Sequence, residues 1–166
     1  MKKTVLKFGR FAFFTATILF LLALVLGKNL SYGAQEVIGY SSMVISLVFV
    51  FFGIKNYRDQ ENGGLISFGQ ALKIGMLITL FAALGFAIID FIYTSFINPE
   101  FMEEFIQHSL EAASEKYAGD ELIAKKAEIE SYRDMSNFAM AMLMFVTVIL
   151  IGFIISLISS LILNKK

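Results

Sequence analysis

The chain of 166 residues contains no cysteine and one histidine, His108. The missing thiols exclude disulfide bonds, cysteine nucleophiles and thiolate metal sites. A single histidine without cysteine neighbours also leaves little for a zinc centre or for general acid–base catalysis. Charged residues make up only 17% of the sequence and the formal net charge is zero, so the charge balance indicates no nucleic-acid partner. We therefore expect a protein that is not an enzyme and has no catalytic residues, cofactor or metal site.

Hydrophobic residues are abundant at 57%, against about 45–50% in ordinary soluble domains. They gather in four long runs, and about 20 residues of helix are enough to cross the hydrocarbon core of a bilayer. Each run must be helical, because a backbone amide in hydrocarbon finds a partner only in its own helix or in a closed barrel, whose alternating pattern these runs lack. The runs predict one membrane domain, residues 1–166, with spans at about 8–27, 37–55, 69–97 and 135–163.

The first run also resembles a cleaved signal peptide, since basic residues precede it and Val25-Leu26-Gly27 is a passable cleavage site. Its apolar stretch is longer than the roughly 7–15 residues usual in such peptides. We expect it to be retained as a span. Cleavage would instead leave three spans with the same orientation.

Lysine and arginine are distributed unevenly around the spans. The N-terminal tail, the second loop and the C-terminus carry nine of them, whereas the first and third loops carry five, and the third loop also holds ten carboxylates. Cytoplasmic loops of membrane proteins are enriched in Lys and Arg. We predict a multi-pass protein of the bacterial inner (cytoplasmic) membrane with both termini in the cytoplasm.

The third loop, residues 98–134, is the largest hydrophilic stretch and has helical signals of its own. The Asn98-Pro99-Glu100 segment predicts a helix start capped by Asn98. Gly119 predicts the end of this helix and Asp120 the cap of the next, which we expect to continue unbroken into the fourth span. The predicted fold is all-α: a polytopic membrane protein with four transmembrane helices and an extracytoplasmic amphipathic helical hairpin between the third and fourth.

The second loop contains two local signals. Asn62-Gly63-Gly64 indicates a turn. Ser67 followed by Gln70 matches a capping box, in which the serine hydroxyl accepts from a backbone amide and the glutamine side chain reaches back. The third span should therefore begin near Phe68.

Asp90 is the only ionisable residue embedded in an apolar run. Carboxylates inside membranes often mark ion or proton paths. Asn98, where the outer loop begins, follows eight residues later, about 12 Å along a helix at 1.5 Å per residue. Asp90 should therefore lie in the outer third of the membrane, either as a transport residue or as a structural carboxylate bonded to a neighbouring helix or to the interface.

Small residues recur at helical spacing on all four spans, as expected where helices pack closely in lipid. The alternative is a polar pathway formed by Thr79, Ser156, Ser159 and Ser160.

On the outer loop, one helical face carries Glu104, His108, Glu111 and Glu115. A divalent cation could be held there, but without a second histidine we expect a solvated acidic face.

Three basic residues flank the second loop and are candidate lipid-headgroup contacts: Lys55, Arg58 and Lys73. Basic side chains near an anionic leaflet each contribute about 1 kcal/mol to the attraction between protein and membrane.

Residues 64–71 come close to a phosphate-binding loop, but they lack its lysine and the following Ser or Thr. We therefore expect no nucleotide to bind there.

The segments Tyr57-Arg58-Asp59 and Gly63-Gly64-Leu65-Ile66-Ser67-Phe68-Gly69-Gln70-Ala71, followed by Gly75, resemble a domain-of-unknown-function family of short bacterial membrane proteins. The resemblance covers nearly the whole chain, including the start of the outer loop at residues 98–101. It implies a four-helix integral membrane protein and carries no established activity.

These observations lead to one principal hypothesis and one alternative. The first is an uncharacterised inner-membrane protein that acts non-enzymatically through association, with membrane lipids, a second copy or another membrane protein as its partners. The alternative is a small transporter or channel with Asp90 in a polar pathway. A membrane enzyme is the weakest candidate, since acid–base residues are so few.

Overall fold

The computed structural model describes residues 1–28 and 30–165, and within them it contains only helices, with no β-strand. The α-helices are α1 (Lys2–Gly27), α2 (Tyr32–Asn56), α3 (Phe68–Ile92), α4 (Phe101–Lys116), α5 (Gly119–Glu130) and α6 (Asn137–Leu163). Two π-helical turns extend α2 and α3, namely η1 (Tyr57–Glu61) and η2 (Tyr93–Ile97), and a 3-10 turn, η3 (Ser131–Asp134), follows α5. The prediction of an all-α fold is confirmed.

Among the described residues, four helical stretches are long and apolar enough to cross a membrane: Lys2–Gly27, Gly33–Glu61, Phe68–Ile97 and Asn137–Leu163. They contain 26 to 30 residues, which at 1.5 Å per residue gives about 39–45 Å, more than the roughly 30 Å of the hydrocarbon core. The prediction of four helices of spanning length and composition is confirmed.

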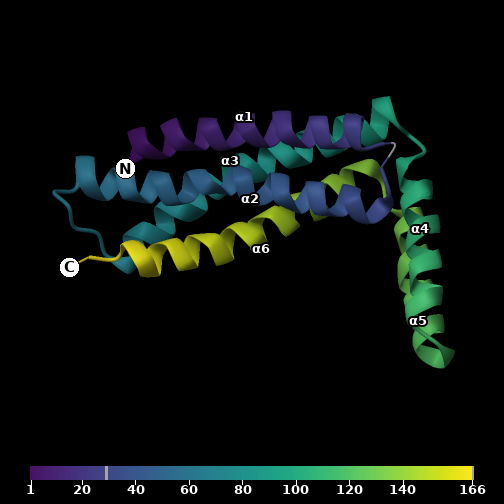
Figure 1. The fold of residues 1–166 in the computed structure, drawn as a ribbon. Helices are drawn as coiled ribbons and strands as arrows, with labels where there is room; N and C mark the ends of the chain where they lie inside the picture. Colours follow the sequence, from purple (N-terminus) through teal and green to yellow (C-terminus); the bar gives the residue numbers. More distant parts are fainter. Residues whose placement is uncertain (29, 166) are drawn as a thin grey trace.

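Helix α3 is the centre of the bundle and packs against α1, α2 and α6 (Figure 1). In the most apolar 18 residues of the span that contains α3, 50% is buried, compared with 22% in the corresponding segments of α1 and α6. Large apolar side chains cover the outside of the bundle, among them Phe14, Leu150 and Ile162, each about 60% exposed. An outer surface of this kind is suited to lipid rather than to water.

Small residues allow α3 to approach its neighbours closely. A Cβ atom placed on Gly75 would lie 2.7 Å from the hydroxyl oxygen of Ser156 on α6. The hydroxyl oxygens of Thr79 and Ser156 are 3.5 Å apart at the same interface, and both residues are fully buried. Ser160 donates a hydrogen bond to the carbonyl oxygen of Ser156 within α6. Contacts of this kind support the packing interpretation of the small residues.

The two ends of the bundle differ. Both termini and the loop between α2 and α3 lie at one end, while α4 and α5 form a hairpin that runs crosswise at the other end and extends to one side of the bundle (Figure 1). Arg133 of η3 fastens the hairpin by donating hydrogen bonds to Glu103 on α4 and to Glu130 on α5. The bond from Arg133 lowers the pKa of the Glu103 carboxyl below its usual value.

Four predictions about the hairpin are wrong, and two of them concern the start of α4 and the end of the second arm. Helix α4 begins at Phe101 without a side-chain cap, because the Asn98 side chain instead donates to the Glu104 carboxylate, 3.2 Å away. The second arm does not run on into the fourth span, because the chain must turn from the crosswise hairpin back into the bundle. It does so through η3, and α6 then begins at Asn137 with Ser136 as its cap.

Gly119 has a φ of +59°, but it is the first residue of α5, and Asp120 follows in the first turn instead of capping the helix.

In the second loop, the predicted turn and capping box are both present. Gly63 and Gly64 have positive φ angles of 63° and 83°, and Ser67 caps α3 together with Gln70.

Candidate functional site

A cavity of about 520 Å³ lies between α1, α2, α3 and α6 at the hairpin end of the bundle. Helix α4 and the turns η2 and η3 contribute its remaining walls, so the crosswise hairpin covers the membrane helices where they meet. The lining includes ten apolar side chains: Phe20, Ala23, Leu24, Met43, Phe101, Met102, Phe105, Met140, Leu143 and Met144. A mainly apolar cavity with a few polar groups is the usual form of a small-molecule site.

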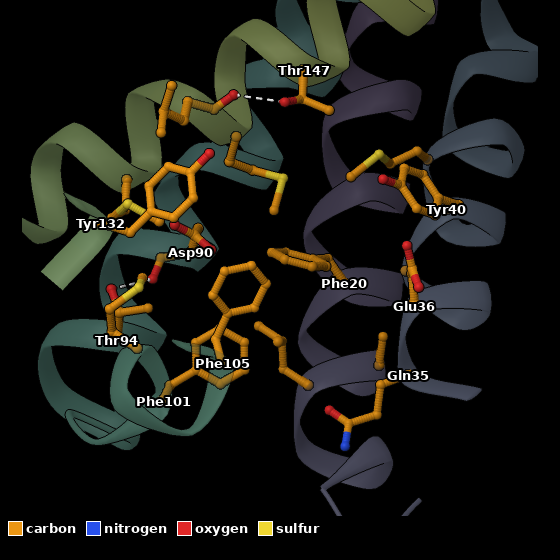
Figure 2. Close-up of a pocket in the computed structure, with 18 of the residues that line it drawn as sticks. Phe20, Gln35, Glu36, Tyr40, Asp90, Thr94, Phe101, Phe105, Tyr132 and Thr147 are labelled. Atoms are coloured by element: carbon orange, nitrogen blue, oxygen red, sulfur yellow. Dashed lines mark hydrogen bonds between the residues drawn. The ribbon is translucent and has the colours of Figure 1, made fainter. Parts of the chain in front are cut away.

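Asp90 on α3 points into this cavity (Figure 2). The residue is only 6% exposed, and within the described residues no hydrogen bond or ion pair reaches its carboxylate. A buried charge without a partner is strongly unfavourable. The bond to a neighbouring helix expected of a purely structural carboxylate is therefore not found in the described part of the chain.

The π-helical turn η2 positions Asp90. The Thr94 hydroxyl donates to the backbone carbonyl oxygen of Asp90 at 2.9 Å, so it binds the main chain and leaves the carboxylate unbonded (Figure 2). The backbone amide of Asn98 donates to the backbone carbonyl oxygen of Tyr93 at 2.8 Å, and this bond closes the wide turn. Single π-turns within helices are frequent at functional sites.

Aromatic rings close the hairpin side of the cavity. Phe101 packs edge-on against Tyr93, with ring centroids 5.5 Å apart, and Phe105 packs against Tyr132 at 6.5 Å. Phe20 extends from α1 on the bundle side and packs against Phe86, with 5.0 Å between the ring centroids. Each of the three rings therefore packs against another aromatic ring, and the Phe101–Tyr93 pair joins the hairpin to the bundle.

A second carboxylate, Glu36 on α2, also lines the cavity and lies across from Asp90, beside Gln35 and Tyr40 (Figure 2). Glu36 is exposed, so it marks the more open side. Other polar groups on the wall are Thr94, Ser109, Tyr132 and Thr147. The described lining contains two carboxylates and no lysine, arginine or histidine.

Sequence reasoning identified Asp90 but not Glu36 or the aromatic wall. Helical spacing offered one signal, because Glu36, Tyr40 and Met43 recur at intervals of four and three residues and share a face of α2. The contribution of Phe101 and Phe105 could not be read from the sequence, because it depends on how the hairpin folds onto the bundle.

The three predicted headgroup contacts lie at the other end of the molecule. Lys55 lines a depression of about 400 Å³ with four phenylalanines from α1 and α2. The Arg58 guanidinium bonds Asp59, with 2.6 Å between Nε and Oδ1, and donates to the carbonyl oxygen of Leu163 at 3.4 Å. Lys73 is exposed on α3. Contact with lipid headgroups stays a prediction for all three residues.

The acidic face of α4 is divided among separate contacts. Glu104 accepts from Asn98, and the Nδ1 atom of His108 lies 3.8 Å from a carboxylate oxygen of Glu111. Within the described part of the chain, no group of three or more His, Asp or Glu residues is placed to hold a metal ion.

A comparison with protein families gives a match over most of the chain. The model of a family described as "Protein of unknown function (DUF4199)" matches residues 7–165, nearly the whole chain. Neither the curated proteins nor the solved structures provide a significant match.

Proposed function

Because the chain belongs to the DUF4199 family, whose description assigns no activity, we propose its function from its own geometry: a non-enzymatic membrane protein that binds a small molecule in the cavity around Asp90. This proposal develops the transporter or channel alternative. One observation carries it, namely a carboxylate that is 6% exposed, points into a 520 Å³ cavity and has no bonding partner among the described residues.

The orientation is part of the proposal. We place the protein in the bacterial inner membrane with the termini in the cytoplasm and the hairpin outside. The charge distribution supports this: among the described residues, eight Lys and Arg belong to the end with the termini and five belong to the hairpin end. The cavity then opens in the outer half of the membrane, where Asp90 and the hairpin meet.

The chain provides a natural background for testing the cavity, because it has no cysteine. Thr147 lines the cavity on α6, whereas Leu150, three residues later, is 61% exposed on the apolar outer surface. We expect a water-soluble maleimide to label the Thr147→Cys variant in membranes, because only a hydrated thiol forms the reactive thiolate. The matched Leu150→Cys variant should stay unlabelled.

A ligand site should also hold small apolar molecules. Methyl, benzyl and naphthylmethyl methanethiosulfonates of increasing size should all modify Thr147→Cys, up to a size set by the cavity. If Thr147→Cys resists every reagent while the protein remains folded and monodisperse, the cavity is closed to ligands and the proposal fails.

Association through the hairpin is a second candidate, favoured by one observation. No residue of α5 is buried within the described structure, and Ile123 is 68% exposed on a hairpin that extends beyond the bundle. We expect a bifunctional maleimide to crosslink Ile123→Cys into dimers, or to a second protein, in native membranes. The Glu121→Cys variant, on a different face of α5, serves as the control. Equal and negligible crosslinking at both positions would count against association.

A further inference from the structure

The charges on the cavity wall all have one sign. Asp90 and Glu36 provide two carboxylates, and no cationic side chain is present among the described lining residues. Asp90 is the deeper of the two, at 6% exposure and without a protein partner among the described residues, while Glu36 is on the exposed side. An arrangement of this kind favours a positively charged occupant and disfavours an anion.

The other walls fit the body of an organic cation. Aromatic faces attract cations within about 6 Å of the ring centroid, and four aromatic residues beside Asp90 line the cavity, namely Phe20, Phe101, Phe105 and Tyr132 (Figure 2). Four methionines also line it: Met43, Met102, Met140 and Met144. Flexible, polarizable thioethers adapt to apolar groups of different shapes.

A metal ion fits this wall less well. Magnesium and calcium require several oxygen ligands around one point. Asp90 and Glu36 lie across the cavity from each other, and no cluster of three ligating residues exists in the part of the chain that the structure describes. The single buried carboxylate therefore matches a single positive charge surrounded by apolar substituents.

We propose that the ligand of this cavity is an organic monocation with an apolar body, such as a quaternary or protonated amine, whose charge lies against Asp90 and whose substituents contact the aromatic wall. This inference rests on the proposed function, since it names the ligand class of the same cavity. Glu36 on the open side attracts the cation, and the ion pair with Asp90 holds it.

The test uses tritiated tetraphenylphosphonium and the full-length protein purified in detergent, with binding measured by scintillation proximity. We expect saturable binding that falls by about tenfold or more in the Asp90→Asn variant, since a charged partner is lost. Asp90→Glu keeps the charge and should bind within a few-fold of wild type. Glu121→Gln, which removes an exposed carboxylate on α5, is the matched control and should bind as wild type does.

A competition experiment needs no variant. Unlabelled triphenylphosphine oxide has three phenyl groups on phosphorus and no net charge, so it should displace the tritiated cation at least about tenfold less well than unlabelled tetraphenylphosphonium does. Equal displacement by the neutral compound, or unchanged binding by Asp90→Asn, would overturn the charge selectivity.

The outcomes separate the two proposals. If Thr147→Cys is labelled from water but tetraphenylphosphonium does not bind, the cavity accepts small molecules and the cation inference is wrong. If Thr147→Cys is also inert to all thiol reagents, the proposed function itself fails.

Discussion

A Cβ atom added to Gly85 of α3 would lie 2.9 Å from the backbone carbonyl oxygen of Phe13 on α1. Main-chain atoms cannot rotate away as a side chain can, so the two helices approach at a distance that only glycine permits. Gly85 lies five residues before Asp90 on α3, and Phe13 lies seven residues before Phe20 on α1, so the contact is within about two helical turns of the cavity.

Substitution of Gly85 by alanine should therefore separate α3 from α1. We expect Gly85→Ala to destabilise the protein by about 1–3 kcal/mol, as overpacking generally does. Thermal unfolding in detergent measures the change. Gly39→Ala is the matched control, because a Cβ atom there meets nothing within 4 Å. Equal stability of the two variants would show that the α1–α3 contact can relax.

The cap of α3 provides a second prediction. The Ser67 hydroxyl accepts from the Gln70 amide at 3.4 Å, and the Ser67 amide donates to the Gln70 side chain at 3.2 Å. Ser67→Ala should lower the free energy of unfolding by about 1 kcal/mol. Ser31 is a suitable control, because it occupies the N-cap position of α2 without a side-chain cap bond. Ser31→Ala should have a clearly smaller effect in the same assay.

The ion pair between Glu103 and Arg133 predicts a pH dependence of the hairpin. The hydrogen bond from Arg133 lowers the pKa of Glu103. Because the pKa of Glu103 is lower in the folded protein than in the unfolded chain, the ion pair stabilises the hairpin at pH values above the unfolded-state pKa of a glutamate, about 4.3. This contribution is lost as the pH falls through the lower folded-state value. Hydrogen exchange of amides 119–134, corrected for intrinsic rates, should therefore accelerate in acid.

Both partners of this pair are about half exposed, so the effect should be small. Glu103→Gln removes the titrating group and should abolish the part of the pH dependence that Arg133 causes. Glu111→Gln, on the same helix and outside this pair, is the control. A wild-type hairpin whose protection does not change between neutral and acidic pH would contradict the prediction.

The proposed orientation predicts opposite accessibility for the two ends. In spheroplasts, a membrane-impermeant maleimide should label Ile123→Cys on α5 directly and Lys165→Cys near the C-terminus only after permeabilisation. The physical reason is the excess of lysine and arginine at the end with the termini. Immediate labelling of Lys165→Cys in intact spheroplasts would reverse the assigned orientation.

Local chemistry explains which predictions from the sequence succeeded. The spans follow from runs of apolar residues, and the capping box at Ser67 depends on residues three apart, so neither requires knowledge of distant contacts. The prediction of an Asn98 cap failed because the Asn98 side chain has a competing partner, Glu104, six residues away. The unbroken helix predicted from Asp120 failed because no local signal records that the hairpin runs crosswise to the bundle.

The sequence alone therefore determined that the chain forms four membrane-length helices and that Asp90 is the only charge buried within an apolar run, because both properties depend on the polarity of consecutive residues. Only the tertiary structure decided what surrounds Asp90. The cavity depends on five helices and the turns η2 and η3 converging at one end, with Glu36 and Phe101 brought together from positions 65 residues apart. Contacts over such distances are fixed by packing between helices, which the pattern along one helix does not encode.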